Sequence, residues 1–395
     1  MAHIVEFKIT GLAGRKDIYI QKLNRDINVF FGDNGTGKTS LLRILRSAMS
    51  NDASTIRTVP FKSAEVVIHS VHYGRDFVKT IHKPKEIGTK TKPIKPDSKI
   101  VRYEDNAIYQ EYFFDKEEEK FQWAIKPSRP DLARTNWMHI YLPTYRLYAS
   151  YDIYSSDRHR RLTPSMDREY DWDLFFAERL KMLWSDCSNQ LLSEVRKIQE
   201  QGLANILRGI VAPTKSIRKI AKKLDSESAY HRVAAFLARQ GSPEALGSLE
   251  EFTKKYEEDL QVRRVIVDIN TIEQRIDKER ASRDKLKKLI SDMFGNNKIV
   301  EFKDTGVEVK TKEGHDISLA LLSSGEKHAL WIFIETLLVR DNTLLIDEPE
   351  ISMHIDWQKR LISAMNQLNK NAQLIIATHS PEIMSDLPDN NIFHL

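Results

Sequence analysis

The feature that most constrains this chain is the segment GDNGTGKT, Gly32 to Thr39, which fits the pattern G-x-x-x-x-G-K-[ST]. The apolar run 27–31 before it predicts a buried strand, and the spacing of 38–49 after it predicts a helix. Glycines in such a loop let backbone N–H groups turn toward phosphate oxygens, and the helix adds the positive end of its dipole. The segment therefore predicts a phosphate-binding loop in an α/β fold.

A second segment, TLLIDEPE, supplies the acids that a nucleotide site needs. Its residues 343–346 are apolar and predict a buried strand that ends at Asp347 and Glu348. We expect Asp347 to hold Mg²⁺, directly or through water, together with the hydroxyl of Thr39. We expect Glu348 to orient or deprotonate the attacking water, and Lys38 to reach the β- and γ-phosphates.

The patterns along the chain predict three segments. Residues 1–165 alternate like strands and form an N-terminal lobe with the phosphate loop, and residues 299–395 form a C-terminal α/β lobe. Between them, residues 166–298 take helical spacing. There 251–290 is one long helical pattern near heptad spacing, and 171–200 is its candidate antiparallel partner in a short coiled coil. The predicted fold class is α/β, a β-rich lobe and a P-loop core with an α-helical insertion.

The composition limits the class of protein and the cellular compartment that we expect for this chain. The chain has 395 residues, 41% hydrophobic and 30% charged, which is typical of a globular protein with a sizeable core. Its net charge of +5 permits an acidic partner without demanding one. A single cysteine, Cys187, excludes a disulfide within the chain and favours a reducing cytoplasm. No run approaches the ~20 apolar residues of a membrane helix, so we expect a cytoplasmic protein without a membrane partner.

Two further motifs carry a resemblance to a known family. LLSSGEKHAL, 321–330, resembles the LSGGQ signature of the ABC ATPase superfamily, and LIIATHS, 374–380, resembles the strand before its switch histidine. The four motifs also occur in that superfamily's order. The resemblance implies an ABC-type ATPase head that binds ATP and Mg²⁺ and hydrolyses ATP. It implies that His379 senses the γ-phosphate and that Lys38 and Glu348 act beside it.

The resemblance also implies a nucleotide site that is shared between subunits. The implied ATP-binding residues come from the phosphate loop and the signature: Asn34, Gly35, Thr36, Gly37, Lys38, Thr39, Ser40, Ser323, Ser324, Gly325 and Glu326. The implied metal ligands are Thr39 and Asp347. In this superfamily the signature of one subunit completes the phosphate loop of another. One copy of each motif then implies a homodimer with ATP between its subunits, and a higher oligomer built on it. ATP binding would close the dimer and hydrolysis would release it.

The spacing of the motifs favours one branch of the superfamily. Thr39 and Leu322 are 283 positions apart, far more than in transporter ATPases, which resembles SMC-type and OLD-type ATPases with helical arms. DEPEISMHIDWQ resembles the DEPE-x-x-[LM]-H-P-x-W-Q run of OLD-like anti-phage ATPases, with Ile355 in place of proline. YLPTYRLY resembles a strand-and-turn segment of defence ATPases. Its Arg146 either takes part in the site or forms a surface ion pair.

Within that branch the chain resembles the AAA_15/AAA_21-type ATPases of two-gene anti-phage systems. Only 15 residues follow Ser380, so we expect any nuclease to lie on a separate polypeptide. The best resemblance is to the AriA type of PARIS, followed by the PtuA type of Septu. It implies a slow ATPase that is a sensor and scaffold in abortive infection. Such a protein holds a separate effector, for example a nuclease, until a phage trigger such as a DNA mimic binds.

A different hypothesis is an SMC-like ATPase for DNA repair or DNA tethering. The basic net charge and the lysine-rich segment 83–99 favour it, and DNA binding there would weaken steeply with salt. The same segment also has the composition of a solvated loop. The sequence leaves open the trigger, the effector and the size of any oligomer.

Overall fold

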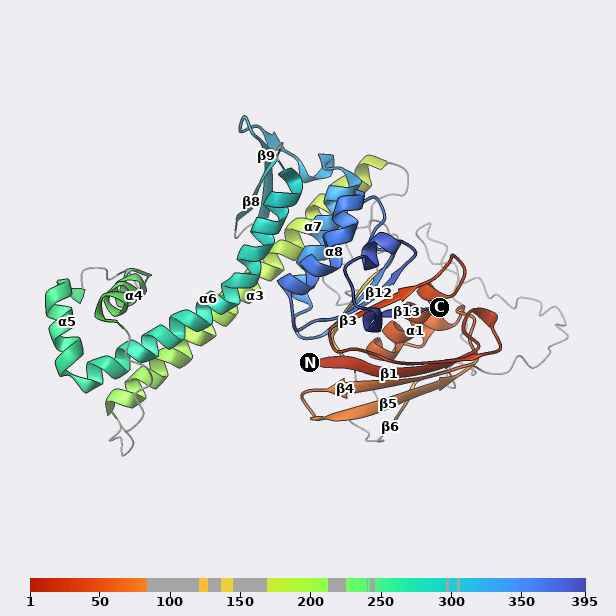
Figure 1. Cartoon of the computed structure of the whole chain (residues 1–395), viewed down its shortest axis with the longest axis horizontal. Coiled ribbons are helices and arrows are strands. Elements are labelled where there is room, and N and C mark those ends of the chain that lie inside the picture. The colour runs from red at the N-terminus through yellow and green to blue at the C-terminus, as the bar shows by residue number, and fades with distance from the viewer. Residues whose placement is uncertain are drawn as a thin grey trace, which may run out of the picture. The chain divides into compact units, whose positions relative to one another are not determined.

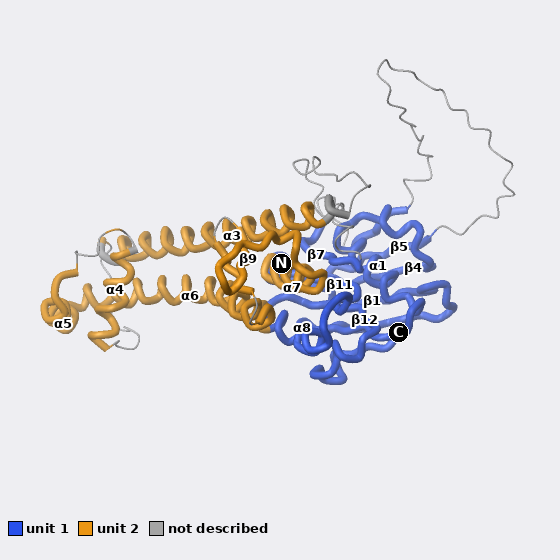
Figure 2. Tube along the Cα trace, turned by 90° about the horizontal axis from the view of Figure 1, so that it is seen from above, with its two compact units in different colours: residues 1–157, 339–366, 370–395 blue, residues 158–338, 367–369 orange. Residues whose placement is uncertain are grey.

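The computed structural model describes residues 1–83, 121–126, 136–144, 169–211, 225–239, 241, 246–295, 298–303 and 306–395. The chain divides into two units, coloured in Figure 2. Unit 1 comprises Met1–Asp157, Val339–Asn366 and Lys370–Leu395, and unit 2 comprises Arg158–Leu338 and Gln367–Asn369. The segment boundaries expected from the sequence, at 165 and 298, stay predictions.

Unit 1 contains a parallel five-stranded sheet in the order β13-β3-β12-β11-β7. Its strands are β13 (Ile392–His394), β3 (Ile27–Phe31), β12 (Gln373–Thr378), β11 (Thr343–Asp347) and β7 (His139–Leu142). Every residue of β11 and β12 is buried, as expected for central strands of a parallel sheet that is covered on both faces. All five carboxyl ends lie at the same edge of the sheet.

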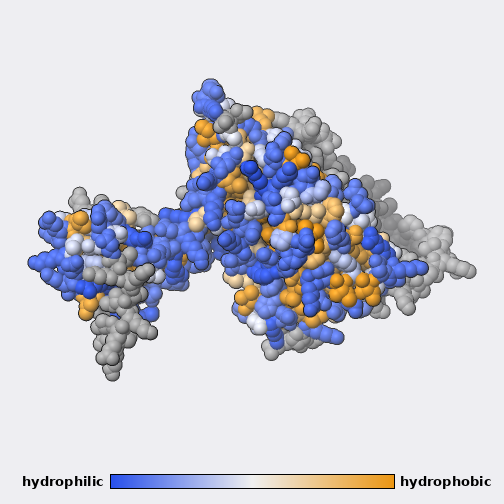
Figure 3. Space-filling model, viewed as in Figure 1, coloured by the Kyte–Doolittle hydropathy of each residue, from blue (hydrophilic) through white to orange (hydrophobic). Residues whose placement is uncertain are grey.

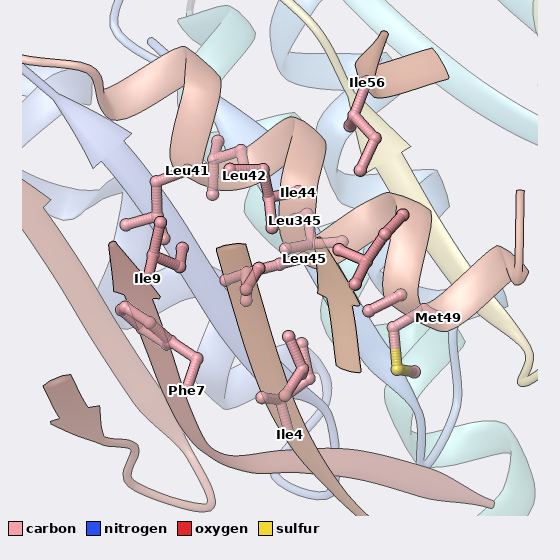
Figure 4. Packing of buried hydrophobic residues seen from close by; sticks show 14 of the residues in the cluster. Ile4, Phe7, Ile9, Leu41, Leu42, Ile44, Leu45, Met49, Ile56 and Leu345 are labelled. Carbon is pink, nitrogen blue, oxygen red and sulfur yellow. The ribbon is translucent and has the colours of Figure 1, made fainter. Parts of the chain in front are cut away.

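A second sheet of unit 1 is antiparallel, in the order β2-β1-β4-β5-β6. Its strands are β1 (Ala2–Thr10), β2 (Ile18–Lys22), β4 (Ser63–Ser70), β5 (Arg75–His82) and β6 (Ala124–Lys126). The core forms where helix α1 (Lys38–Ser50) packs between strands of the two sheets. Figure 4 shows Leu41 and Leu45 of α1 near Phe7 of β1 and Leu345 of β11. This packing fixes the helix that follows the phosphate loop.

Unit 2 is mainly helical. Its elements are α3 (Glu169–Val211), α4 (Ser226–Arg239), α5 (Leu249–Glu258), α6 (Leu260–Phe294), β8 (Lys298–Lys303), β9 (Gly306–Thr311), β10 (Asp316–Ile317) and α7 (Ser324–Leu338). Helices α3 and α6 run side by side in opposite directions (Figure 1). A Cβ at Gly202 would lie 2.3 Å from the Ile272 side chain, so glycine permits the close approach of the two helices.

The end of this helical pair carries α4 and α5 and has its own apolar core, which includes Phe236, Phe252, Tyr256 and Ile269. The face of this end that Figure 3 shows is mostly hydrophilic. Within the described residues, no helix of the protein is both long enough and apolar enough to cross a membrane. Helix α8 (Ile355–Leu368), which follows β11, completes the longer elements.

The architecture confirms the predicted α/β class with a helical insertion. One expectation was wrong: the single helix over 251–290 is two helices, because Asp259 leaves the helical conformation. Its carboxylate caps α6, accepting from the backbone N–H of Gln261 at 2.7 Å and of Val262 at 3.4 Å. Residues 99–105 and 107–114, which the alternating pattern of the N-terminal lobe also predicts as strands, lie outside the described residues.

Candidate active site

The candidate site lies at the carboxyl edge of the parallel sheet. Four neighbouring strands each deliver one element of it: β3 leads into the phosphate loop, β11 ends at Asp347, β12 leads into His379, and β7 is followed by Thr144. Ligands of parallel α/β sheets bind at this edge, since loops from separate strands meet there. The sheet order therefore gathers residues that are far apart in the sequence.

The phosphate loop has the conformation expected for anion binding. Gly35 and Gly37 have φ of 83° and 103°, which side chains other than glycine rarely adopt. The Nζ of Lys38 donates to the carbonyls of Gly32 at 2.7 Å and Asp33 at 2.9 Å. An ammonium group has three donors, so these two bonds leave one for a phosphate oxygen. The predicted loop and its lysine are in place.

Asp347, the predicted metal ligand, lies at the centre of a hydrogen-bonded cluster. It is 1% exposed, and its Oδ2 accepts hydrogen bonds from the hydroxyls of Thr39 at 2.8 Å and Thr144 at 2.9 Å. Burial and then the nearby Asp347 charge raise the pKa of Tyr141 to about 12. The Thr39 oxygen keeps its lone pairs while it donates its proton. A carboxylate beside a hydroxyl oxygen is a donor set that fits Mg²⁺, which prefers hard oxygen ligands.

Glu348 and His379 lie together beyond Asp347. Glu348 has φ of 48°, a left-handed conformation that is uncommon outside glycine, and its N–H donates to the Ala377 carbonyl at 2.8 Å. The Nδ1 of His379 lies 3.5 Å from Oε1 of Glu348 and 3.4 Å from Oε1 of Glu350. The backbone conformation and these distances place an acid and an imidazole side by side, where general acid–base groups could act.

Sequence reasoning missed two contributors to this site. Thr144 follows the apolar strand β7, whose pairing with β11 brings it to Asp347, and no local motif in the sequence encodes that pairing. Glu350 was noted only as part of a motif, although it contacts His379. Arg146 and the lysine-rich segment beyond Lys83 lie outside the described residues.

The predicted signature residues belong to unit 2, at the start of α7. Ser323 and Glu326 form a capping box: the N–H and hydroxyl of Ser323 donate to Glu326 Oε2 at 2.8 Å and 2.9 Å, and the Glu326 N–H donates back to Oγ at 3.3 Å. Lys298 of β8 donates to both carboxylate oxygens at 2.8 Å. Ser324 and Gly325 occupy the first turn of the helix. Their predicted contact with ATP stays a prediction.

A parallel α/β sheet with a phosphate loop, a buried aspartate bonded to the loop threonine and an adjacent glutamate defines a P-loop ATPase. Residues 27–385 match the family described as "AAA domain, putative AbiEii toxin, Type IV TA system". That match spans most of the chain, and the protein therefore belongs to this family.

The other similarities cover less of the chain or have low sequence identity. A segment of 97 residues is 31% identical to the "Retron Ec83 probable ATPase" of Escherichia coli, covering 21% of this chain and 18% of that protein. The Smc head domain of Pyrococcus furiosus, bound to the C-terminal domain of ScpA, matches at 12% identity with TM-score 0.43, covering 100% of this chain and 93% of that one. The SMC head domain from Thermotoga maritima matches at 10% identity and TM-score 0.39, covering 99% and 94%.

Proposed function

We propose that this ATPase hydrolyses ATP slowly, with Mg²⁺, as the switch of a sensor and scaffold protein in a two-gene anti-phage defence system. The observation that carries the proposal is the hydrogen bond from Thr39 to Asp347 at 2.8 Å, with Glu348 next to that carboxylate in the chain. It joins the phosphate loop to the acidic pair. These are the two halves of a magnesium-dependent phosphoryl-transfer site.

The residues divide the chemistry among them. The phosphate loop and the remaining Lys38 donor would bind the β- and γ-phosphates, while Thr39 and Asp347 would hold Mg²⁺, which would neutralise phosphate charge when bound. Glu348 is 21% exposed at its side chain, so it is accessible to water and acts as the group that orients the nucleophile. His379, 46% exposed, would sense the γ-phosphate through the attacking water.

The use of ATP as a switch rests on the signature. This chain carries one signature segment, at 321–330, and one phosphate loop. In the ABC superfamily these motifs meet across a subunit interface. We therefore propose a homodimer that closes on ATP and opens on hydrolysis, and that assembles further.

The defence role rests on the family and its relatives. The family description names a toxin and a Type IV toxin–antitoxin system, and the Escherichia coli relative is named as part of a retron. Both descriptions support an ATPase that works with another component. We propose that the partner is a separate effector, such as a nuclease, and that a phage protein releases it. The AriA type remains our first assignment within this class and the PtuA type the second.

The test is the native mass and composition of the Glu348→Gln protein, purified with ATP and Mg²⁺ from its own host. We expect a large assembly that contains a second, nuclease-like polypeptide. The matched control is Lys38→Ala, which should lose nucleotide and the closed assembly. A dimer that brings only DNA would contradict the scaffold role and support the DNA-repair hypothesis.

A further inference from the structure

Glu350 is a buried acid that the roles proposed above leave unused. It lies two residues after Glu348, in the turn between β11 and α8, and is 4% exposed. Its Oε2 has no hydrogen-bond partner in the part of the chain that the structure describes. A buried carboxylate oxygen that lacks a hydrogen-bond partner lowers the stability of the folded state, so the presence of Glu350 needs an explanation.

The contacts of the other oxygen converge on the end of β12. Oε1 of Glu350 accepts from the Thr378 hydroxyl at 2.5 Å and from the His379 N–H at 3.2 Å, and lies 3.4 Å from His379 Nδ1. Among the described residues, His379 has the only basic side chain within 4 Å of this carboxylate. Glu350 thus holds both the backbone and the ring of one residue.

The direction of these hydrogen bonds is fixed. The Ser380 N–H can only donate, and it donates to the Thr378 oxygen at 3.0 Å. The single proton of that hydroxyl is then committed to Glu350. Ser380 also contacts Gln358 of α8 at 2.9 Å, and Gln358 donates to the Met353 carbonyl at 3.0 Å. Through Gln358, helix α8 is therefore hydrogen-bonded both to the turn that carries Glu350 and to the end of β12.

The two glutamates beside His379 differ in access to water. Glu348 is 21% exposed at its side chain, whereas Glu350 is 5% exposed at its own, so Glu350 is poorly placed to activate a water molecule. Ionised carboxylates only accept hydrogen bonds, and both face Nδ1. Such neighbours favour the tautomer that carries its proton on Nδ1 and leaves the lone pair of Nε2 as a hydrogen-bond acceptor for water.

We propose that Glu350 is a positioning residue for His379, which fixes the end of β12 and keeps the imidazole proton on Nδ1, so that the lone pair of Nε2 can accept a hydrogen bond from the water that attacks the γ-phosphate. The catalytic part of this inference rests on the proposed ATP hydrolysis. The tautomer does not depend on it and can be observed without nucleotide.

The test compares Glu350→Gln with the wild-type full chain by two measurements. Long-range ¹H–¹⁵N spectra of ¹⁵N-histidine protein, assigned with His379→Gln, report the tautomer without nucleotide. The amide oxygen that takes the place of Oε1 can still accept from Thr378 and from the His379 N–H, but it presents no negative charge to Nδ1, so we expect the tautomer with its proton on Nδ1 to lose population to the one with its proton on Nε2. With ATP and Mg²⁺ we expect kcat to fall about 10- to 100-fold, as for other partners that orient a histidine, with KM within about twofold.

Two further variants keep the test decisive. Thr378→Val removes the hydroxyl that holds Oε1 and should shift the spectrum in part, even if Glu350→Gln folds poorly. Asp356→Asn, an acid 71% exposed near the start of α8, should leave both measurements unchanged. If Glu350→Gln retains the wild-type tautomer and kcat, the inference is overturned. If the tautomer moves while the wild-type protein hydrolyses no ATP, the positioning role stands and the proposed function fails.

Discussion

The hydroxyl of Thr39 donates to Oδ2 of Asp347 at 2.8 Å, although 308 positions separate the two residues in the sequence. The bond links the first turn of α1 to the end of β11, and Thr144 donates to the same oxygen at 2.9 Å. Residues from three segments of unit 1 thus meet at one oxygen, Oδ2 of Asp347. Magnesium affinity should depend on the charge of that carboxylate.

Asp347→Asn should weaken magnesium activation of ATP hydrolysis about 10- to 100-fold. The amide oxygen can still accept from both threonines, so the fold should persist while the negative charge is lost. A magnesium titration of ATPase activity measures the effect. Thr144→Val removes one donor but no charge and should shift the magnesium midpoint by much less. Equal shifts in the two variants would contradict the role of the Asp347 charge.

Glu348→Gln and Lys38→Ala should separate turnover from binding. The glutamine keeps the shape of the side chain but not its basicity, so ATP should bind as before while most turnover is lost and the closed dimer accumulates. The alanine removes the Nζ group that faces the loop and should abolish nucleotide binding. Binding of a fluorescent ATP analogue and phosphate release measure the two effects. Normal phosphate release by Glu348→Gln would show that another residue activates water.

Much of this site could be predicted because its signals are local. Strand 27–31 and the helix from Lys38 were found with their observed starts, since glycines separate an apolar run from a helical pattern. Asp347 was found because an apolar strand ends there. Features that a short stretch of residues specifies can therefore be predicted from a single sequence.

The features that could not be predicted are set by the order of strands in the sheet, by contacts in the folded protein, or by one residue that caps a helix. Thr144 matters because β7 pairs with β11, which no short motif encodes. Glu350 looked like one more acid in a turn until the contacts with Thr378 and His379 were visible. The break at Asp259 was hidden because the apolar spacing continues across it, and one aspartate cap decided the boundary.

Gly37→Ala should weaken nucleotide binding at least about tenfold. A side chain at φ of 103° is strained, and a Cβ here would lie 2.9 Å from the Cβ of Ala13, so the loop must shift. The binding assay with the fluorescent ATP analogue measures the loss. Gly74→Ala is the matched control, because Gly74 also has positive φ but open space around it. It should lower the melting temperature slightly and leave nucleotide affinity unchanged.

Glu335 of α7 should make unit 2 less stable as the pH rises. Its burial raises its pKa from 4.5 to about 7, partly opposed by the positive charge of Arg179. Because the folded state binds this proton more tightly, its stabilising contribution is complete below pH 4.5 and is lost as the pH rises through about 7. Glu335→Gln should therefore gain melting temperature relative to wild type between pH 5 and 8. Glu178→Gln, at an exposed acid of α3, should show no such trend.

The capping box at the start of α7 should contribute measurably to stability through its link to β8. Glu326 accepts from Lys298 and Ser323, and its side chain is 13% exposed. Although burial alone would raise it, the bonds from Lys298 and then Ser323 hold the pKa of Glu326 below its ordinary value. Its stabilising contribution is therefore present above pH 4.5 and is lost as the pH falls through the lower folded value.

Lys298→Met and Glu326→Gln should each lower the free energy of unfolding at neutral pH by about 1–2 kcal/mol. The double variant should lose less than the sum, since both changes remove the same interaction. Denaturant unfolding at pH 7 and pH 4 measures the cycle, and the loss in Glu326→Gln should shrink at the lower pH. Lys303→Met is the control, because its pair with Glu308 is exposed and should change stability by less than about 1 kcal/mol. Additive losses in the double variant would mean that Lys298 and Glu326 stabilise the unit independently, despite their contact.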